Sequence, residues 1–167
     1  DSILPANHEI KRRIIFDYEL IYIADGEFVF YYDDIAYPCK AGQFIFIRPG
    51  IPHSFSEIKS NLTQPHIHFD ISHLSNSKQV PISFKDFSAL TENEKNWIRE
   101  DIFFKYPKTP FVYFSDNQQA LQLFYEIVHK THRSALLGKA KLLQLIEMLL
   151  YDNFANIFKQ DYHLYPV

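Results

Sequence analysis

Four polar residues in the first half of the chain have the types and spacing to bind a ligand: Glu19, His53, His66 and His68. His66 and His68 are two residues apart, so their side chains share one face if this segment is a strand. Two histidine nitrogens and a carboxylate can bind a first-row transition metal. Two histidines on one strand are more often the hydrogen-bonding residues of a pocket. We therefore predict ligand-binding roles for these four residues, and no metal.

Two further residues are candidates for ligand contacts. Arg48 can bind an anionic ligand, although an arginine at a turn can equally be exposed. Phe55 can stack on a sugar ring, although most aromatic residues of this chain should belong to the core. The sequence contains no GxSxG, P-loop or GxGxxG motif, and the single cysteine, Cys39, has no neighbouring histidine. We therefore predict no catalytic residue, no cofactor and no enzymatic activity.

The first half of the chain has the pattern of β-structure. Short runs rich in Ile, Phe, Tyr and Val alternate with turn signals, and Gly26, Gly42 and Gly50 lie at three of the joints. Even spacing of short strands and turns indicates an antiparallel sandwich or barrel. The predicted strands are residues 17–23, 27–32, 35–38, 43–48, 53–58 and 65–71.

The middle of the chain, residues 74–110, is expected to be irregular. Its polar start at 74–80 is typical of a loop. Thr91 has the chemistry of an N-cap and can begin a short helix. Residues 111–114 have the composition of a last strand.

The last third of the chain is predicted to form two helices. Ser115 or Asp116 can cap the first, which runs to about Arg133. Ser134 can cap the second, which covers about residues 135–158. We therefore divide the chain into a barrel domain at 1–114 and a helical pair at 115–167.

The second predicted helix has two apolar stripes. One includes Leu136 and Leu143, and the other, displaced by about 100°, contains Leu142, Leu145 and Leu149. A second stripe needs a second surface, which either the preceding helix or a partner subunit can supply. Leu142, Leu145 and Leu149 are therefore the candidate dimerisation residues.

Composition excludes some classes of partner. The net charge of −3 gives no domain-wide positive field for nucleic acid. No stretch approaches the roughly 20 apolar residues of a membrane span, and there is no signal peptide. The single cysteine fits a reducing compartment, so we expect a cytoplasmic protein without a membrane partner. The chain begins at Asp1 rather than Met, which we interpret as the boundary of a fragment.

One segment is similar to the second motif of the cupin barrels. From Gly42 to His53 the sequence follows the pattern of glycine, five residues, Pro-x-Gly, two residues and histidine, with Arg48 in place of the first proline. Glu19 lies seven residues before Gly26, where the first cupin motif places its metal-binding glutamate. The two histidines that should precede this glutamate are missing, because residues 12–15 are Arg-Arg-Ile-Ile. The resemblance therefore favours a barrel without the usual metal set.

The whole chain resembles the N-terminal regulatory domain of AraC-type transcription regulators. The resemblance rests on residues 18–55, on the HIHFD segment at 66–70 and on the two terminal helices. It implies a mainly β fold with α-structure at the C-terminus: a cupin-like barrel (a double-stranded β-helix, or jelly-roll) followed by a two-helix hairpin that forms a homodimer. In that family a domain with two helix-turn-helix motifs normally follows. This chain stops at Val167, so we expect DNA contacts only through a domain absent from it.

The predicted function is that of an effector-sensing and dimerisation domain. Its metal-free barrel would bind a small molecule, for which a sugar is one possibility, and so control DNA binding. One alternative is a metal-dependent cupin isomerase or dioxygenase that uses Glu19, His53, His66 and His68. Another is a dimerising barrel without a ligand, its interior filled by Phe and Tyr.

Overall fold

The computed structural model describes residues 2–71, 74–81, 83, 85–103, 111–114, 117–129 and 134–161, with the side chains of the last helix described as far as Leu150. Two compact units divide the chain at residue 114: Asp1–Phe114 and Ser115–Val167. The first unit contains the described strands, and the second contains two long helices.

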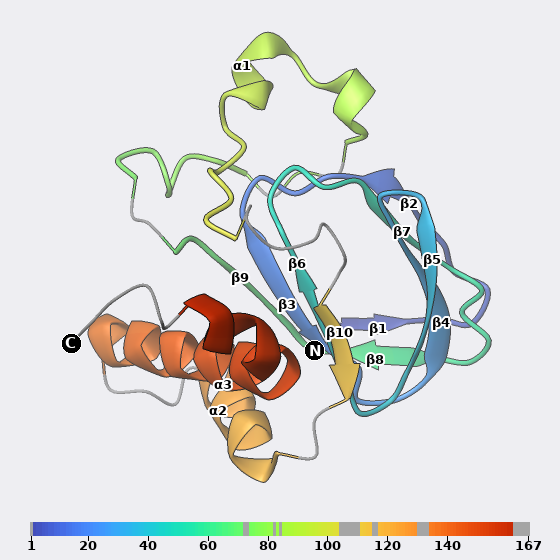
Figure 1. The fold of residues 1–167 in the computed structure, drawn as a ribbon. Coiled ribbons are helices and arrows are strands. Elements are labelled where there is room, and N and C mark those ends of the chain that lie inside the picture. The colour runs from blue at the N-terminus through green and yellow to red at the C-terminus, as the bar shows by residue number, and fades with distance from the viewer. Residues whose placement is uncertain are drawn as a thin grey trace. The chain divides into compact units, whose positions relative to one another are not determined.

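Two four-stranded antiparallel sheets make up the first unit and face each other (Figure 1). The first has the order β10 (Phe111–Phe114), β6 (Gln43–Ile47), β3 (Tyr18–Tyr22) and β9 (His66–Phe69). The second has the order β2 (Ile10–Arg13), β7 (His53–Ser56), β4 (Glu27–Tyr32) and β5 (Ile35–Lys40). A two-stranded sheet joins β1 (Ser2–Leu4) to β8 (Leu62–Gln64). Paired antiparallel sheets of this kind confirm the predicted jelly-roll architecture.

Turn chemistry places the hairpins where the sequence predicts them. Asp33 and Asp34 join β4 to β5 and both have positive φ, at 49° and 67°. A two-residue loop with positive φ at both positions matches the right-handed twist of its strands. Gly26 precedes β4 with φ of +98°, and a Cβ there would lie 2.9 Å from the carbonyl oxygen of Asn61. Only glycine fits this position without strain.

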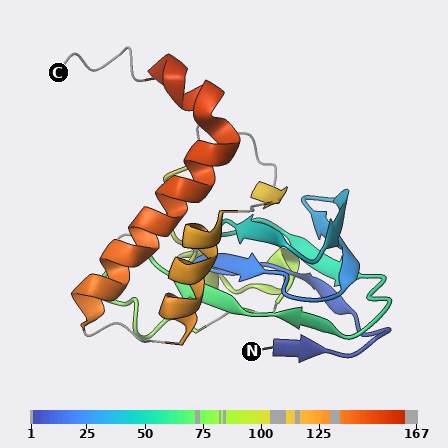
Figure 2. The ribbon, with the colours of Figure 1, turned by 90° about the horizontal axis from the view of Figure 1, so that it is seen from below.

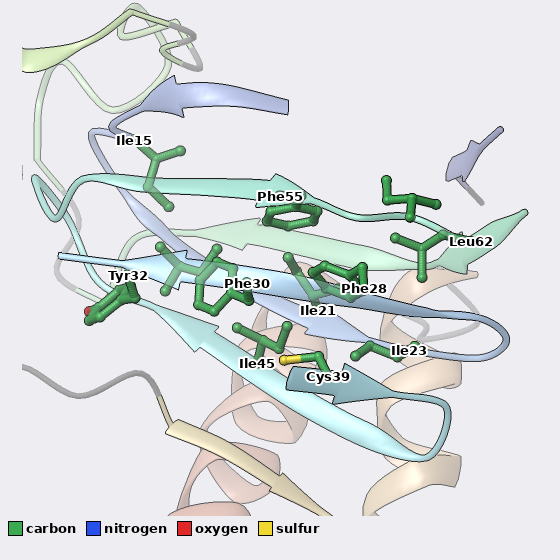
Figure 3. Close-up of a cluster of buried hydrophobic side chains, with 12 residues drawn as sticks. Ile15, Ile21, Ile23, Phe28, Phe30, Tyr32, Cys39, Ile45, Phe55 and Leu62 are labelled. Carbon is green, nitrogen blue, oxygen red and sulfur yellow. The ribbon is translucent and has the colours of Figure 1, made fainter. Parts of the chain in front are cut away.

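The space between the two sheets holds a hydrophobic core (Figure 3). Phe55 lies at its centre, with ring centroids 4.8 Å from Phe28 and 5.4 Å from Phe30. The core consists of twelve buried residues: Ile15, Ile21, Ile23, Phe28, Phe30, Tyr32, Cys39, Ile45, Ile47, Phe55, Ile58 and Leu62. Apolar side chains therefore surround Phe55.

The opposite face of the β10-β6-β3-β9 sheet is also apolar. The Tyr18 ring stacks on Phe46 and Phe69, with centroids 5.6 and 5.7 Å away. Its hydroxyl accepts a hydrogen bond from the Ile102 amide (2.9 Å) and donates to the Asp101 carboxylate (3.2 Å). Burial on both faces explains why β6 is apolar at consecutive positions instead of alternating.

Short helical segments follow the strands. The 3₁₀ turn η1 covers Phe87–Ala89, and α1 covers Glu92–Lys95. Thr91 caps α1 as predicted: its hydroxyl accepts from the Glu94 amide while the Glu94 carboxylate accepts from the Thr91 amide. This reciprocal pair is a capping box.

The second unit contains α2 (Gln118–Val128) and α3 (Ala135–Asp161), which lie side by side (Figures 1 and 2). Asn117 caps α2, whereas the predicted caps Ser115 and Asp116 lie outside the described residues. The prediction for α3 is confirmed, because the Ser134 hydroxyl accepts from the Leu137 amide at 3.2 Å. No helix among the described residues has the length and apolarity to span a bilayer.

The structure changes the interpretation of the leucines on α3. Leu145 and Leu149 are buried and Leu142 is half-buried. The exposed leucines are Leu136 (79% exposed), Leu143 (55%) and Leu137. The candidate dimerisation residues thus differ in exposure from the leucines of the first stripe.

Candidate functional site

Strand register gathers three polar side chains on the inner face of the β10-β6-β3-β9 sheet. Glu19 on β3 lies opposite His68 on β9, and Ile21 lies opposite His66. Residues directly opposite each other project to the same face. One ligand atom from each of Glu19, His66 and His68 lies within 4.8 Å of the others. The two histidines are half-buried, and β9 is the edge strand of its sheet.

Glu19 is the most deeply buried of the three, with 2% of its surface exposed. Its Oε1 lies 3.5 Å from Nε2 of His68. Its Oε2 is buried and has no hydrogen-bond partner among the described residues. A buried carboxylate oxygen without a partner is costly, so this atom marks a position where a ligand or ion would be stabilising.

His68 connects Glu19 to a second carboxylate. Its Nδ1 lies 3.2 Å from Oδ1 of Asp17, the residue that precedes β3. Burial lowers the pKa of His68, but the hydrogen bond to Asp17 and the charge of Glu19 outweigh it and leave the pKa above its ordinary value. The imidazole ring is thus held between two acidic residues.

His66 has a neutral hydrogen-bond partner. Its Nδ1 lies 3.3 Å from the carbonyl oxygen of Gln64. Because a carbonyl only accepts, Nδ1 carries the hydrogen and Nε2 carries the lone pair. The His66 and His68 rings are nearly perpendicular, with centroids 5.6 Å apart.

His53 on β7 is close to this group but is not part of it. Its Nδ1 faces the carbonyl of Ile51 at 3.1 Å, and its Nε2 accepts from Nε of Arg13 at 3.4 Å. Burial lowers the pKa of His53 to about 3, so the ring is neutral at physiological pH. Its position fits a structural hydrogen bond to β2.

A hollow of about 200 Å³ opens beside His68. Its polar lining includes Asp17, Asp70, Ser77 and Arg99. Arg99 donates to Oδ1 of Asp70 at 3.0 Å, which fixes the guanidinium in the wall. A smaller hollow of about 90 Å³ shares Asp70 and Arg99 and extends towards Tyr18 and Glu100.

Residues 5–85 match the family model described as the AraC-like ligand binding domain. Residues 5–85 are thus similar to an AraC-like ligand-binding domain. The match confirms the predicted resemblance, and all six candidate ligand residues lie within it. The description of this family indicates a ligand-binding role.

The solved structures that are similar to this chain overlap it only in part. A conserved protein of unknown function from Streptococcus pyogenes is 21% identical, covers 42% of this chain and 61% of its own, and has a TM-score of 0.39. A predicted oxalate decarboxylase from Thermotoga maritima is 25% identical over 41% of this chain and 62% of its own, with a TM-score of 0.38. The matched regions thus span about three fifths of those two proteins. A search of curated proteins found no match.

Two of the predicted ligand residues, Arg48 and Phe55, are buried among partners in the first unit. Arg48 is 1% exposed, donates to the carbonyl of Phe103 at 2.9 Å and pairs with Asp101 at 3.3 Å. Phe55 lies in the core between the sheets. The structure therefore brings Glu19, His66 and His68 together. Arg48 instead contacts Asp101 and Phe103, and Phe55 lies among apolar side chains.

Sequence reasoning missed several residues of the site in the AraC-like domain. Asp17 and Asp70 lie directly before β3 and directly after β9, so polar residues at strand ends were the available signal. Arg99 comes from the irregular segment after α1, and Arg13 is the last residue of β2. No local motif predicts that Arg99 lies in the wall of the hollow or that Arg13 contacts His53.

Proposed function

We propose that this chain is the effector-sensing and dimerisation part of an AraC-type transcription regulator. The observation that carries the proposal is the match of residues 5–85 to an AraC-like ligand binding domain. The polar hollow beside His68 supplies a candidate position for the effector. DNA would be contacted through a separate helix-turn-helix domain of the intact regulator.

The chemistry of the hollow favours a small polyhydroxylated effector, such as a single sugar ring. Asp17 and Asp70 offer acceptors, Arg99 offers donors, and Ser77 and His68 offer either. Sugar hydroxyls present donors and acceptors at close spacing, so they can satisfy such a mixed lining. Apolar contact is available from Phe69, Val80 and Pro81 on the same wall.

Effector binding would act on the segment that follows β9. The hollow is bounded both by residues of β9 and by residues 77–81, so an occupant contacts both. A ligand shifts a conformational equilibrium only by its difference in affinity for the two states. We expect the arrangement of this segment to differ between the free and bound states.

Dimerisation would use the exposed part of α3. Leu136 and Leu143 are seven residues apart, which places them on one face of the helix, and both are exposed. Exposed leucines at this spacing are typical of a helix that packs against another helix. In the intact regulator such a dimer would set the separation of two DNA-binding domains.

A thermal-shift screen against monosaccharides tests the effector proposal. A sugar at about 100 times its dissociation constant should stabilise the fold by about 2.7 kcal/mol, which is a shift of several degrees. Ser77→Trp should abolish the shift because it fills the hollow. Ser75→Trp is the matched control, since Ser75 is exposed in the same loop. Equal shifts in both variants would place the effector elsewhere.

The alternative of a metal-dependent enzyme rests on the grouping of Glu19, His66 and His68. An enzyme requires turnover as well as metal binding. Incubation of the metal-loaded chain with sugars and small carboxylates, followed by product analysis, separates the two functions. Turnover that Glu19→Gln abolishes would favour the enzyme, whereas sugar binding without turnover would favour the sensor.

A further inference from the structure

We propose that Glu19, His66 and His68 form a binding site for a divalent first-row transition metal, with Zn²⁺ as the representative ion. Their ligand atoms lie within 4.8 Å of one another. Atoms bound to one Zn²⁺ at 2.0–2.2 Å lie about 3 to 4 Å apart, so side-chain adjustments of about 1 Å would complete the site.

Hydrogen bonds already orient both imidazoles as metal ligands. Nδ1 of His66 faces the carbonyl of Gln64, and Nδ1 of His68 faces the carboxylate of Asp17. Both partners are acceptors, so each Nδ1 carries a hydrogen. Nε2 of His66 then presents its lone pair, and Nε2 of His68, which faces Oε1 of Glu19, presents one when a metal displaces its proton. A histidine ligand in a metal site almost always donates its other N–H to a carboxylate or carbonyl in this way.

The third ligand, Glu19, has one carboxylate oxygen beside His68 and a second that is buried without a partner among the described residues. Glu19 is 2% exposed, and its Oε2 has no hydrogen-bond partner among the described residues. A cation beside this oxygen would offset the cost of burying it. A second carboxylate lies nearby, because Oδ1 of Asp17 is 3.2 Å from Nδ1 of His68.

The site differs from the cupin metal motifs in the origin of its histidines. His66 and His68 come from β9, whereas His53, which lies in the second motif, accepts a hydrogen bond from Arg13. Two histidines and one carboxylate leave coordination positions for water or a small ligand. Because β9 is an edge strand and both histidines are half-buried, an ion can reach them from solvent.

Calorimetric titration of the untagged chain with Zn²⁺, and absorption spectroscopy with Co²⁺, test the site. We expect one ion per chain and visible Co²⁺ bands that Zn²⁺ displaces. Glu19→Gln and His68→Ala should each weaken binding at least tenfold. Asp17→Asn should weaken it by about 10- to 100-fold through the orientation of His68.

His8→Ala and His129→Ala are the controls, because both histidines are exposed and lie outside the cluster. They should leave the affinity unchanged. The melting temperature of each variant without metal shows whether it folds. A folded wild-type chain that binds no Zn²⁺, or binding that folded Glu19→Gln and His68→Ala variants retain in full, would overturn the proposal. Sugar-induced stabilisation is a separate readout, so failure here does not decide the effector proposal.

Discussion

Glu19 and His68 face each other across β3 and β9, with Oε1 of the glutamate 3.5 Å from Nε2 of the histidine. His68 is also bonded to Asp17, whose carboxylate lines the hollow beside β9. The ring therefore links the buried inner face of the sheet to a solvent-accessible cavity. A ligand in the hollow that moves the His68 ring would therefore also change the contact between His68 and Glu19.

Replacing Gly26 by alanine should destabilise the first unit. The residue has φ of +98°, and a Cβ would lie 2.9 Å from the Asn61 carbonyl oxygen and 3.1 Å from Cα of Leu62. Both neighbours are backbone atoms, so they cannot rotate away. We expect a loss of about 1–3 kcal/mol, measured by urea unfolding. Ser60→Ala, at an exposed position, is the control, and a Gly26→Ala change below about 0.5 kcal/mol would contradict the strain argument.

Cys39 should be unreactive in the native protein. The side chain is buried in the core, and burial raises the pKa of its thiol to about 12. Thiolate is the reactive form, so Ellman's reagent at pH 8 should label the chain only after unfolding. Rapid labelling without denaturant would show that the core around β5 opens.

The same thiol should make stability depend on alkaline pH. The pKa of an unfolded cysteine is near 9, whereas the folded thiol keeps its proton until about pH 12. Above pH 9 the unfolded state therefore releases a proton that the folded state retains, and stability falls with rising pH. The drop in urea midpoint from pH 8 to pH 10 should be smaller in Cys39→Ala than in the wild type. Equal drops would show that Cys39 does not contribute.

Removal of Arg48 should cost stability rather than ligand affinity. The guanidinium is 1% exposed and pairs with Asp101, so its loss leaves a carboxylate and the Phe103 carbonyl without their partner. We expect Arg48→Met to lower the free energy of unfolding by about 3 kcal/mol. Lys59→Met breaks an exposed ion pair with Glu27 and should have no measurable effect. Lost Zn²⁺ binding in a folded Arg48→Met variant would argue against a purely structural role.

Dimerisation should depend on the exposed leucines of α3. Light scattering of Leu136→Glu/Leu143→Glu should show a monomer at concentrations where the wild type is a dimer, because two charges would be buried in the contact. Gln144→Glu adds a charge at another exposed position of the helix and should leave the dimer intact. A wild-type monomer at high concentration, or a double variant that still dimerises, would remove α3 from the interface.

Local signals were enough to predict much of the fold. The aspartate pair after β4, the capping box at Thr91 and the hydroxyl of Ser134 act within a few residues, so the sequence reveals them directly. β2 was missed because Lys11 and Arg12 make it polar. An edge strand with exposed charges has no apolar alternation to detect.

The site was predictable only where strand periodicity determines it. The spacing of His66 and His68 predicts a shared face, and the register with β3 brings Glu19 to the same face. The burial of Arg48 was not predictable, because its partners Asp101 and Phe103 lie more than fifty residues away in an irregular segment. Long-range pairs of this kind leave no pattern in the local sequence.

Tyr18 and Glu19 are consecutive residues with opposite environments, one in an aromatic stack and the other among histidines. Because strand side chains alternate, a shift of β3 by one residue would send the carboxylate into the stack and the phenol to the histidines. The aromatic stack around Tyr18 therefore fixes the register of β3 and, with it, the position of the Glu19 carboxylate. Residues 18–22 should tolerate conservative substitutions but not the insertion or deletion of one residue.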